Sequence, residues 1–341
     1  MTQFTSASTG EEVCQEFSSH IKASKVLITG VTPGSIGGEA AFQISRHAPS
    51  LLVLAGRNIQ TLQELDEKIK LETPSARTRL LVCDLSSQES VRKAAEEVNA
   101  YPETIDIMIN SAGVMATPYS VTKEGLELQF GTNHIGHFLL TNLILSNMLQ
   151  QGATNIRVVN VSSSGHKRGP VRFDDPGFED GRSYDKWQAY GQSKTANMLF
   201  SVSLAEKLGA KGVQSFSLYP GRMVTGIVKH LSMEDWLKAG IFPVYNLIFV
   251  VAKLTLITML GWKHPDGSMN TDPKLNWTTT RHGAATLIVA AYNPSIFDQN
   301  GSYMVNSQVN NSEAADYALG SQNAERLWGI SEDLVGQKFS Y

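Results

Sequence analysis

The chain has 341 residues, of which 42% are hydrophobic and 18% charged, with a formal net charge of −3 at pH 7. This composition is ordinary for a globular protein with a sizeable core, and the charge gives no general reason to expect a nucleic-acid partner. The two cysteines, Cys14 and Cys83, have neither metal-ligand spacing nor the pattern of a disulfide framework. We therefore expect no metal site and a reducing, cytoplasmic location.

Residues 1–22 are polar and lack a basic start before an apolar run, so we expect a loose N-terminal extension without a secretory signal. Apolar runs typical of strands buried on both faces then alternate with helical patterns. The expected strands are 25–29, 51–55, 79–83, 105–110, 156–161 and 213–218, with a shorter seventh at 302–305. The expected helices are 36–46, 59–71, 88–98, 126–149 and 189–208. This order predicts one α/β domain over residues 23–341, a doubly wound parallel sheet of about seven strands with helices on both faces.

A glycine-rich turn follows the first strand and opens a helix, as a dinucleotide-binding turn requires. Its candidate phosphate-binding residues are Gly30, Gly34, Ser35, Ile36 and Gly37. Glycine allows the backbone to approach a pyrophosphate closely, and the helix N-terminus offers N–H groups to an anion. A simple strand–helix connection is the alternative.

The ends of the next strands carry further candidate cofactor contacts. The second strand ends without a carboxylate but with Arg57, which can pair with a 2′-phosphate, so NADP(H) is favoured over NAD. The alternative for Arg57 is a solvated loop residue. After the third strand, Asp84 can accept from an adenine amino group or cap the following helix. Asn110, Ala112 and Gly113 end the fourth strand, where small residues let the backbone approach a ligand, although Asn110 could equally stabilise the turn.

The segment 240–260 is apolar and near membrane-spanning length, but Pro243 lies near its start and Lys253 deep inside it. Three interpretations stay open: a lid over a substrate pocket, a peripheral membrane contact, or a true span.

Tyr190 and Lys194 are four residues apart, which places them on one face of a helix. A phenol beside a fixed ammonium ionises more easily than a free phenol, so the pair could transfer a proton near neutral pH. An ordinary surface contact would show the same spacing. His134, His137 and His166 have no carboxylate partner at metal spacing, so we expect them to be packed or solvated.

In this order the motifs resemble those of the short-chain dehydrogenase/reductase family over about residues 25–336. The set comprises the glycine turn, the Asn-x-Ala-Gly strand end, a helix Asn, a strand-five Ser, the Tyr-x-x-x-Lys pair and a Pro-Gly turn. The runs 54–58, 159–163 and 327–336 are most similar to the retinol-dehydrogenase and WW-domain-oxidoreductase branch. Ser35 departs from the family pattern, because it makes the glycine turn one residue longer.

The resemblance implies a Rossmann-type fold and roles for individual residues. Tyr190 would transfer the proton, and Lys194 would lower the pKa of Tyr190 and bond the nicotinamide ribose. Ser163 would hold the substrate oxygen, and Asn133 would hold a water that links Lys194 to solvent. The residues after strand six, Pro220, Gly221, Met223 and Thr225, would meet the nicotinamide.

Together these features predict an NADP(H)-dependent oxidoreductase that interconverts a carbonyl and an alcohol on a fairly apolar small molecule, with residues 226–280 as its pocket region. A sugar-nucleotide epimerase or dehydratase would reuse the same Tyr and Lys, and a non-enzymatic cofactor-bound sensor is a third hypothesis. The chain would be a monomer or a homodimer.

Overall fold

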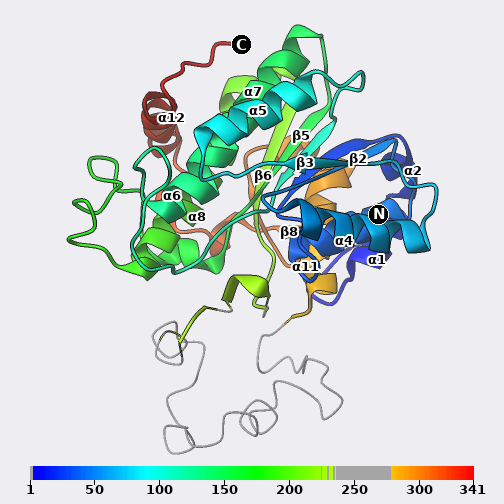
Figure 1. The fold of residues 1–341 in the computed structure, drawn as a ribbon, viewed down its shortest axis with the longest axis horizontal. Coiled ribbons are helices and arrows are strands. Elements are labelled where there is room, and N and C mark those ends of the chain that lie inside the picture. Colours follow the sequence, from blue (N-terminus) through cyan, green and yellow to red (C-terminus); the bar gives the residue numbers. More distant parts are fainter. Residues whose placement is uncertain (1–2, 224, 229, 233–234, 236–277) are drawn as a thin grey trace, which may run out of the picture.

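The computed structural model describes residues 3–223, 225–228, 230–232, 235 and 278–341 (Figure 1). The described residues form an eight-stranded sheet of order β3-β2-β1-β4-β5-β6-β7-β8, in which β8 pairs antiparallel to β7 and the other pairs are parallel. The strands are β1 Lys25–Thr29, β2 Leu51–Gly56, β3 Thr78–Val82, β4 Ile107–Asn110, β5 Ile156–Val161, β6 Val213–Tyr219, β7 Tyr303–Val305 and β8 Gln308–Val309. The predicted doubly wound sheet is confirmed, with one strand more than expected.

The strand order reverses at β1, which pairs with β2 on one side and with β4 on the other. Leu27, for example, lies opposite Val53 of β2 and Met108 of β4. In such sheets, ligands bind outside the carboxyl ends of the strands at this switch point. The fold therefore places a crevice next to the residues that follow β1 and β4.

Helices cover both faces of the sheet because the central strands are buried on both sides, as in β1. Leu27 packs with the layer of α5 (Gln88–Asn99), α7 (Gly136–Gln150), α8 (Lys186–Leu208) and α12 (Ser321–Val335). Its neighbours Val26 and Ile28 pack with the layer of α3 (Ile36–Ser45), α4 (Ile59–Glu72) and α11 (Thr280–Tyr292). Figure 1 shows the two layers on opposite sides of the strands.

The loose extension expected for residues 1–22 is wrong for residues 3–22. These residues form α1 (Gly10–Glu16) and α2 (Ser18–Lys22), and α1 packs against α11. Thr9 and Glu12 form a reciprocal capping box at the start of α1. Val13 and Ile21 are fully buried, so the segment completes the core on the α11 side of the sheet.

The long helix expected at 126–149 is interrupted. A three-residue helix α6 (Leu128–Phe130) runs into a π-helical turn at Gly131–Ile135 and then into α7. Glycines make the close packing of this region feasible: a Cβ on Gly131 would lie 2.3 Å from Thr122 Cγ2, and one on Gly136 would lie 2.4 Å from Leu85 O. Single π turns in helices often occur at functional sites.

α8 begins at Lys186, three residues before the expected start, because the Asp185 side chain caps it by accepting from two backbone N–H groups. In the part of the chain that the structure describes, no helix is long and apolar enough to cross a membrane. The segment 240–260, and most of the predicted pocket region 226–280, lie outside the described residues.

Candidate functional site

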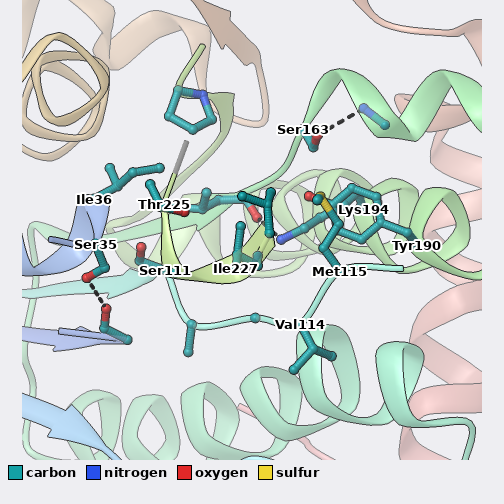
Figure 2. Close-up of a pocket in the computed structure, with 18 of the residues that line it drawn as sticks. Ser35, Ile36, Ser111, Val114, Met115, Ser163, Tyr190, Lys194, Thr225 and Ile227 are labelled. Atoms are coloured by element: carbon teal, nitrogen blue, oxygen red, sulfur yellow. Dashed lines mark hydrogen bonds between the residues drawn. The ribbon is translucent and has the colours of Figure 1, made fainter. Parts of the chain in front are cut away.

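A cavity of about 1300 Å³ opens at the carboxyl ends of the strands, at the switch point. Fourteen of the predicted site residues line it: Gly30, Gly34, Ser35, Ile36, Arg57, Ala112, Gly113, Ser163, Tyr190, Lys194, Pro220, Gly221, Met223 and Thr225. Figure 2 shows Ser35 and Ile36 on one side of the cavity and Ser163, Tyr190 and Lys194 on the other. Segments far apart in the sequence therefore meet in one site.

The glycine turn has the geometry of an anion cradle. Gly30 and Gly34 have φ values of +75° and +78°, and a Cβ on Gly30 would lie 2.6 Å from Ala112 Cα. The extra residue, Ser35, caps α3, because its hydroxyl accepts from Gly38 N at 3.0 Å. Gly37 does not line the cavity; a Cβ there would lie 3.0 Å from Gly30 O, so this glycine lets the helix approach the strand. The turn thus fits a nucleotide phosphate at the start of α3.

Thr29, which the sequence analysis did not single out, joins the ends of β1 and β4. Its Oγ1 accepts from Ser111 N at 3.0 Å and from Ala112 N at 3.1 Å, and it lies 2.8 Å from His137 Nε2. These bonds hold the strand-end backbone against the cavity. Its position as the last residue of β1 was the only signal in the sequence.

Asn110 and Asp84 are not among the described residues that line the cavity, and their side chains are hydrogen-bonded within the protein, so their contacts with the cofactor stay a prediction. The Asn110 amide donates to Thr141 Oγ1 at 3.0 Å and to Asn160 Oδ1 at 2.9 Å, inside the core. The Asp84 carboxylate accepts from the N–H and the hydroxyl of Ser86. Asp84 does not cap α5, because Ser87 does so.

Arg57 is exposed at the end of β2 and lines the cavity. The next residue, Asn58, caps α4 by accepting from Gln60 N at 2.8 Å and from Thr61 N at 3.3 Å. The cap fixes the backbone beside Arg57, so the guanidinium is carried at the edge of the cavity. A phosphate oxygen there would meet a cation that can bind it through two N–H groups.

Tyr190 and Lys194 lie on α8 and are 6% and 3% exposed, so the surface-contact alternative is wrong. Lys194 Nζ donates to Val161 O at 3.0 Å and lies 5.7 Å from the centroid of the Tyr190 ring. Burial raises the pKa of Tyr190 to about 12, a hydrogen bond with Ser163 partly opposes this rise, and burial lowers the pKa of Lys194 to about 8. The predicted fall in the Tyr190 pKa is therefore absent here, because desolvation of the phenolate outweighs the other effects.

Hydrogen bonds distinguish the neighbouring serines after β5. Ser162 is buried and donates to Lys194 O at 2.8 Å, so its hydroxyl is used in packing. Ser163 accepts from Gly165 N at 3.0 Å and is the hydrogen-bond partner of Tyr190. The geometry therefore favours Ser163, as the resemblance did.

Asn133 lies in the π turn and does not line the cavity. Its side chain accepts from Val114 N at 2.8 Å and donates to Val114 O at 2.9 Å and to Ser193 Oγ at 2.9 Å. It thus joins the cavity wall at Val114 to α8. Its role in holding a water stays a prediction.

The histidines are packed, which was one of the two expectations. His134 is buried among Phe130, Phe138 and Phe200, and burial lowers its pKa to about 3. Burial likewise lowers the pKa of His137 to about 4. The described residues contain no group of three or more side chains that could hold a metal ion.

A doubly wound sheet with a glycine turn and with a half-buried Ser163 beside the buried Tyr190 and Lys194 at its switch point defines a nucleotide-dependent oxidoreductase. The short chain dehydrogenase family pattern matches residues 24–174. Short-chain dehydrogenase TIC 32 A, chloroplastic, from Brassica napus is 33% identical over 341 residues, covering 97% of this chain and 94% of that protein. Retinol dehydrogenase 12 from Mus musculus is 30% identical over 311 residues, covering 91% and 86%. The chain belongs to the short-chain dehydrogenase family, in its retinol-dehydrogenase-like branch.

Solved structures share the fold. An uncharacterized protein from Mycobacterium paratuberculosis has a TM-score of 0.66 and 25% identity, with both chains fully covered. Levodione reductase has a TM-score of 0.59 and 18% identity, covering 86% of this chain and 98% of that chain. The likeness to levodione reductase concerns the fold alone.

Proposed function

We propose that this protein is an NADP(H)-dependent oxidoreductase that interconverts a carbonyl and an alcohol on a fairly apolar small molecule. The observation that carries the proposal is that Ser163, Tyr190 and Lys194 line the same cavity as the glycine turn after β1. Proton transfer and nucleotide binding are thereby available within one site.

A nicotinamide bound there would supply or accept the hydride. The hydroxyls of Ser163 and Tyr190 would hold the substrate oxygen, and Tyr190 would donate its proton during reduction and accept one during oxidation. Lys194 would provide a nearby positive charge and bond the ribose. Because both α8 side chains are almost fully buried, water is largely excluded around the proton that moves.

Arg57 supports the choice of NADP(H) over NAD. It is the cation at the end of β2, where an NAD site would carry a carboxylate for the ribose 2′-hydroxyl. Its exposure at the cavity edge leaves room for a 2′-phosphate.

An apolar substrate is supported by the cavity wall and by the relatives. The described wall includes Val114, Met115, Trp187, Ile227 and Val228. Several similar proteins are named retinol dehydrogenases, and retinol is an apolar alcohol.

A cytoplasmic location fits the two free, buried cysteines. Peripheral membrane contact through residues 240–260 is also part of the proposal.

The test follows NADPH absorbance with a panel of all-trans-retinal, long-chain aldehydes and aryl ketones. We expect the wild type to reduce at least one of them, and Tyr190→Phe to lose roughly 100-fold or more in kcat. Tyr292→Phe is the matched control, because Tyr292 is a buried tyrosine that bonds Ser24 away from the cavity. Wild-type rates in Tyr190→Phe would contradict the mechanism, and NADPH binding without turnover would favour a sensor.

A further inference from the structure

His166 lies in the 3-10 turn Ser164–Arg168, directly after β5, and its side chain is fully buried. Its Nδ1 lies 2.6 Å from Ser163 O, and its Nε2 lies 3.1 Å from Ala315 N. A backbone N–H can only donate, so Nε2 must accept. Nδ1 then carries the proton and donates it to Ser163 O. Both ring nitrogens are satisfied only in this one neutral tautomer.

The backbone and ring of His166 tie the turn to three other parts of the chain. Its carbonyl accepts from Thr195 Oγ1 of α8 at 3.2 Å and from Tyr317 Oη at 2.9 Å. Its ring packs edge-to-face on Tyr303 of β7, with centroids 5.3 Å apart. The turn is thus fixed from β7, α8 and residues 315–317, although His166 itself does not line the cavity.

The same turn packs against Ser163 and Tyr190, the two residues whose hydroxyls would hold the substrate oxygen. Ser163 Oγ accepts from Gly165 N at 3.0 Å, and a methyl group on Gly165 would lie 2.7 Å from the Tyr190 ring. A shift of the turn would therefore move the Ser163 hydroxyl relative to the Tyr190 hydroxyl.

We propose that His166 is a positioning residue: by donating to Ser163 O and accepting from Ala315 N, it holds the Ser163 hydroxyl against Tyr190. The position of the Ser163 hydroxyl does not depend on the proposed function. Only the expected fall in kcat rests on the proposed function, because it requires reduction of a carbonyl by NADPH. The proposal also assigns residues 315–317, more than 100 positions after the catalytic residues, to the support of the site.

Protonation of His166 would break this arrangement, because a protonated Nε2 would face the Ala315 N–H. Burial lowers the pKa of His166, and the bond to Ser163 O partly opposes this change. The charged groups facing the ring are Lys167 and Glu313, which pair with each other at 2.9 Å, and the phenols near it are those of Tyr303 and Tyr317. The neutral tautomer is therefore the working form at neutral pH.

The test compares His166→Phe, which keeps a ring but loses both hydrogen bonds, with His166→Gln, whose amide can donate to Ser163 O and accept from Ala315 N. His134→Phe is the matched control, a buried histidine bonded to Ser331 instead. With NADPH and the best carbonyl of the panel, we expect kcat to fall roughly 10- to 100-fold in His166→Phe, with the KM for NADPH nearly unchanged. We expect His166→Gln to recover most of the rate and His134→Phe to keep it.

Two measurements do not depend on turnover. Nitrogen-15 NMR of histidine-labelled wild-type protein should show His166 as the neutral Nδ1–H tautomer at pH 7. Crystal structures should show the Ser163 hydroxyl displaced from Tyr190 in His166→Phe and in place in His166→Gln. An unmoved Ser163 in His166→Phe, or the Nε2–H tautomer in the wild type, would overturn the proposal. A wild type inactive on every carbonyl would instead refute the proposed function.

Discussion

Gly165→Ala tests how closely the turn after β5 packs on the proton-transfer residue. The new methyl carbon would lie 2.7 Å from Tyr190 Cε1, 2.9 Å from Cδ1 and 3.2 Å from Ser163 Oγ. The first distance is about 0.7 Å shorter than the 3.4 Å at which ordinary contact begins. Because the Tyr190 ring is buried, the new methyl group can be accommodated only if Tyr190 or Ser163 moves. Overpacking of this kind costs about 1–3 kcal/mol in stability.

A displacement approaching 1 Å at the reacting groups lowers activity by roughly 100-fold. We therefore expect kcat/KM for NADPH-dependent carbonyl reduction to fall by about that factor, together with a lower unfolding temperature. Gly169→Ala is the control in the same turn, because its methyl would meet nothing closer than 3.9 Å. If Gly165→Ala kept wild-type activity and stability, the packing of Gly165 against Tyr190 would be wrong.

Three further predictions concern charge and burial. Arg57→Asp should weaken NADPH binding roughly 10- to 100-fold more than NADH binding in a fluorescence titration, and an unchanged ratio would remove the 2′-phosphate assignment. Burial lowers the pKa of Lys194 from 10.5 to about 8, so the unfolded chain binds more protons between these values and stability rises with pH. From about pH 7.5 to about pH 9.5, the free energy of unfolding of the wild type should gain about 2 kcal/mol relative to Lys194→Met in urea titrations, and no relative gain would contradict the burial of this ammonium. Burial raises the pKa of Cys14 and Cys83 to about 12, so a thiol reagent at pH 8 should modify neither until the protein unfolds, and rapid native-state labelling would refute this.

The sequence predicted the sheet well because strands buried on both faces are mostly apolar; in β5, for example, four of the six residues are Val or Ile and all six are buried. Prediction from the sequence failed where the local structure depends on which helices and loops pack against each other. Gly136, which directly follows the π turn, packs closely against Leu85, and α1 packs against α11. Neither contact leaves a periodic pattern in the chain.

The candidate site likewise has features that the sequence predicted and features that it did not. Ser163, Tyr190 and Lys194 were predicted from spacing and resemblance, and the fold brings them to one cavity. The hydrogen bond of Asn110 to Asn160 was not predicted, because Asn160 lies on the neighbouring strand β5, 50 positions away in the sequence. The direction of the Tyr190 pKa was also missed, since spacing reveals a neighbouring ammonium but not the burial that opposes it.

The central claim is hydride transfer with Tyr190 as the proton donor. The most direct measurement uses NADPH carrying deuterium at the transferable position of C4, with the carbonyl panel and mass spectrometry of the products. We predict that the wild type forms an alcohol with deuterium on the carbinol carbon and that Tyr190→Phe forms at least roughly 100-fold less. The absence of deuterated alcohol from every carbonyl, or equal yields from the two proteins, would contradict the claim.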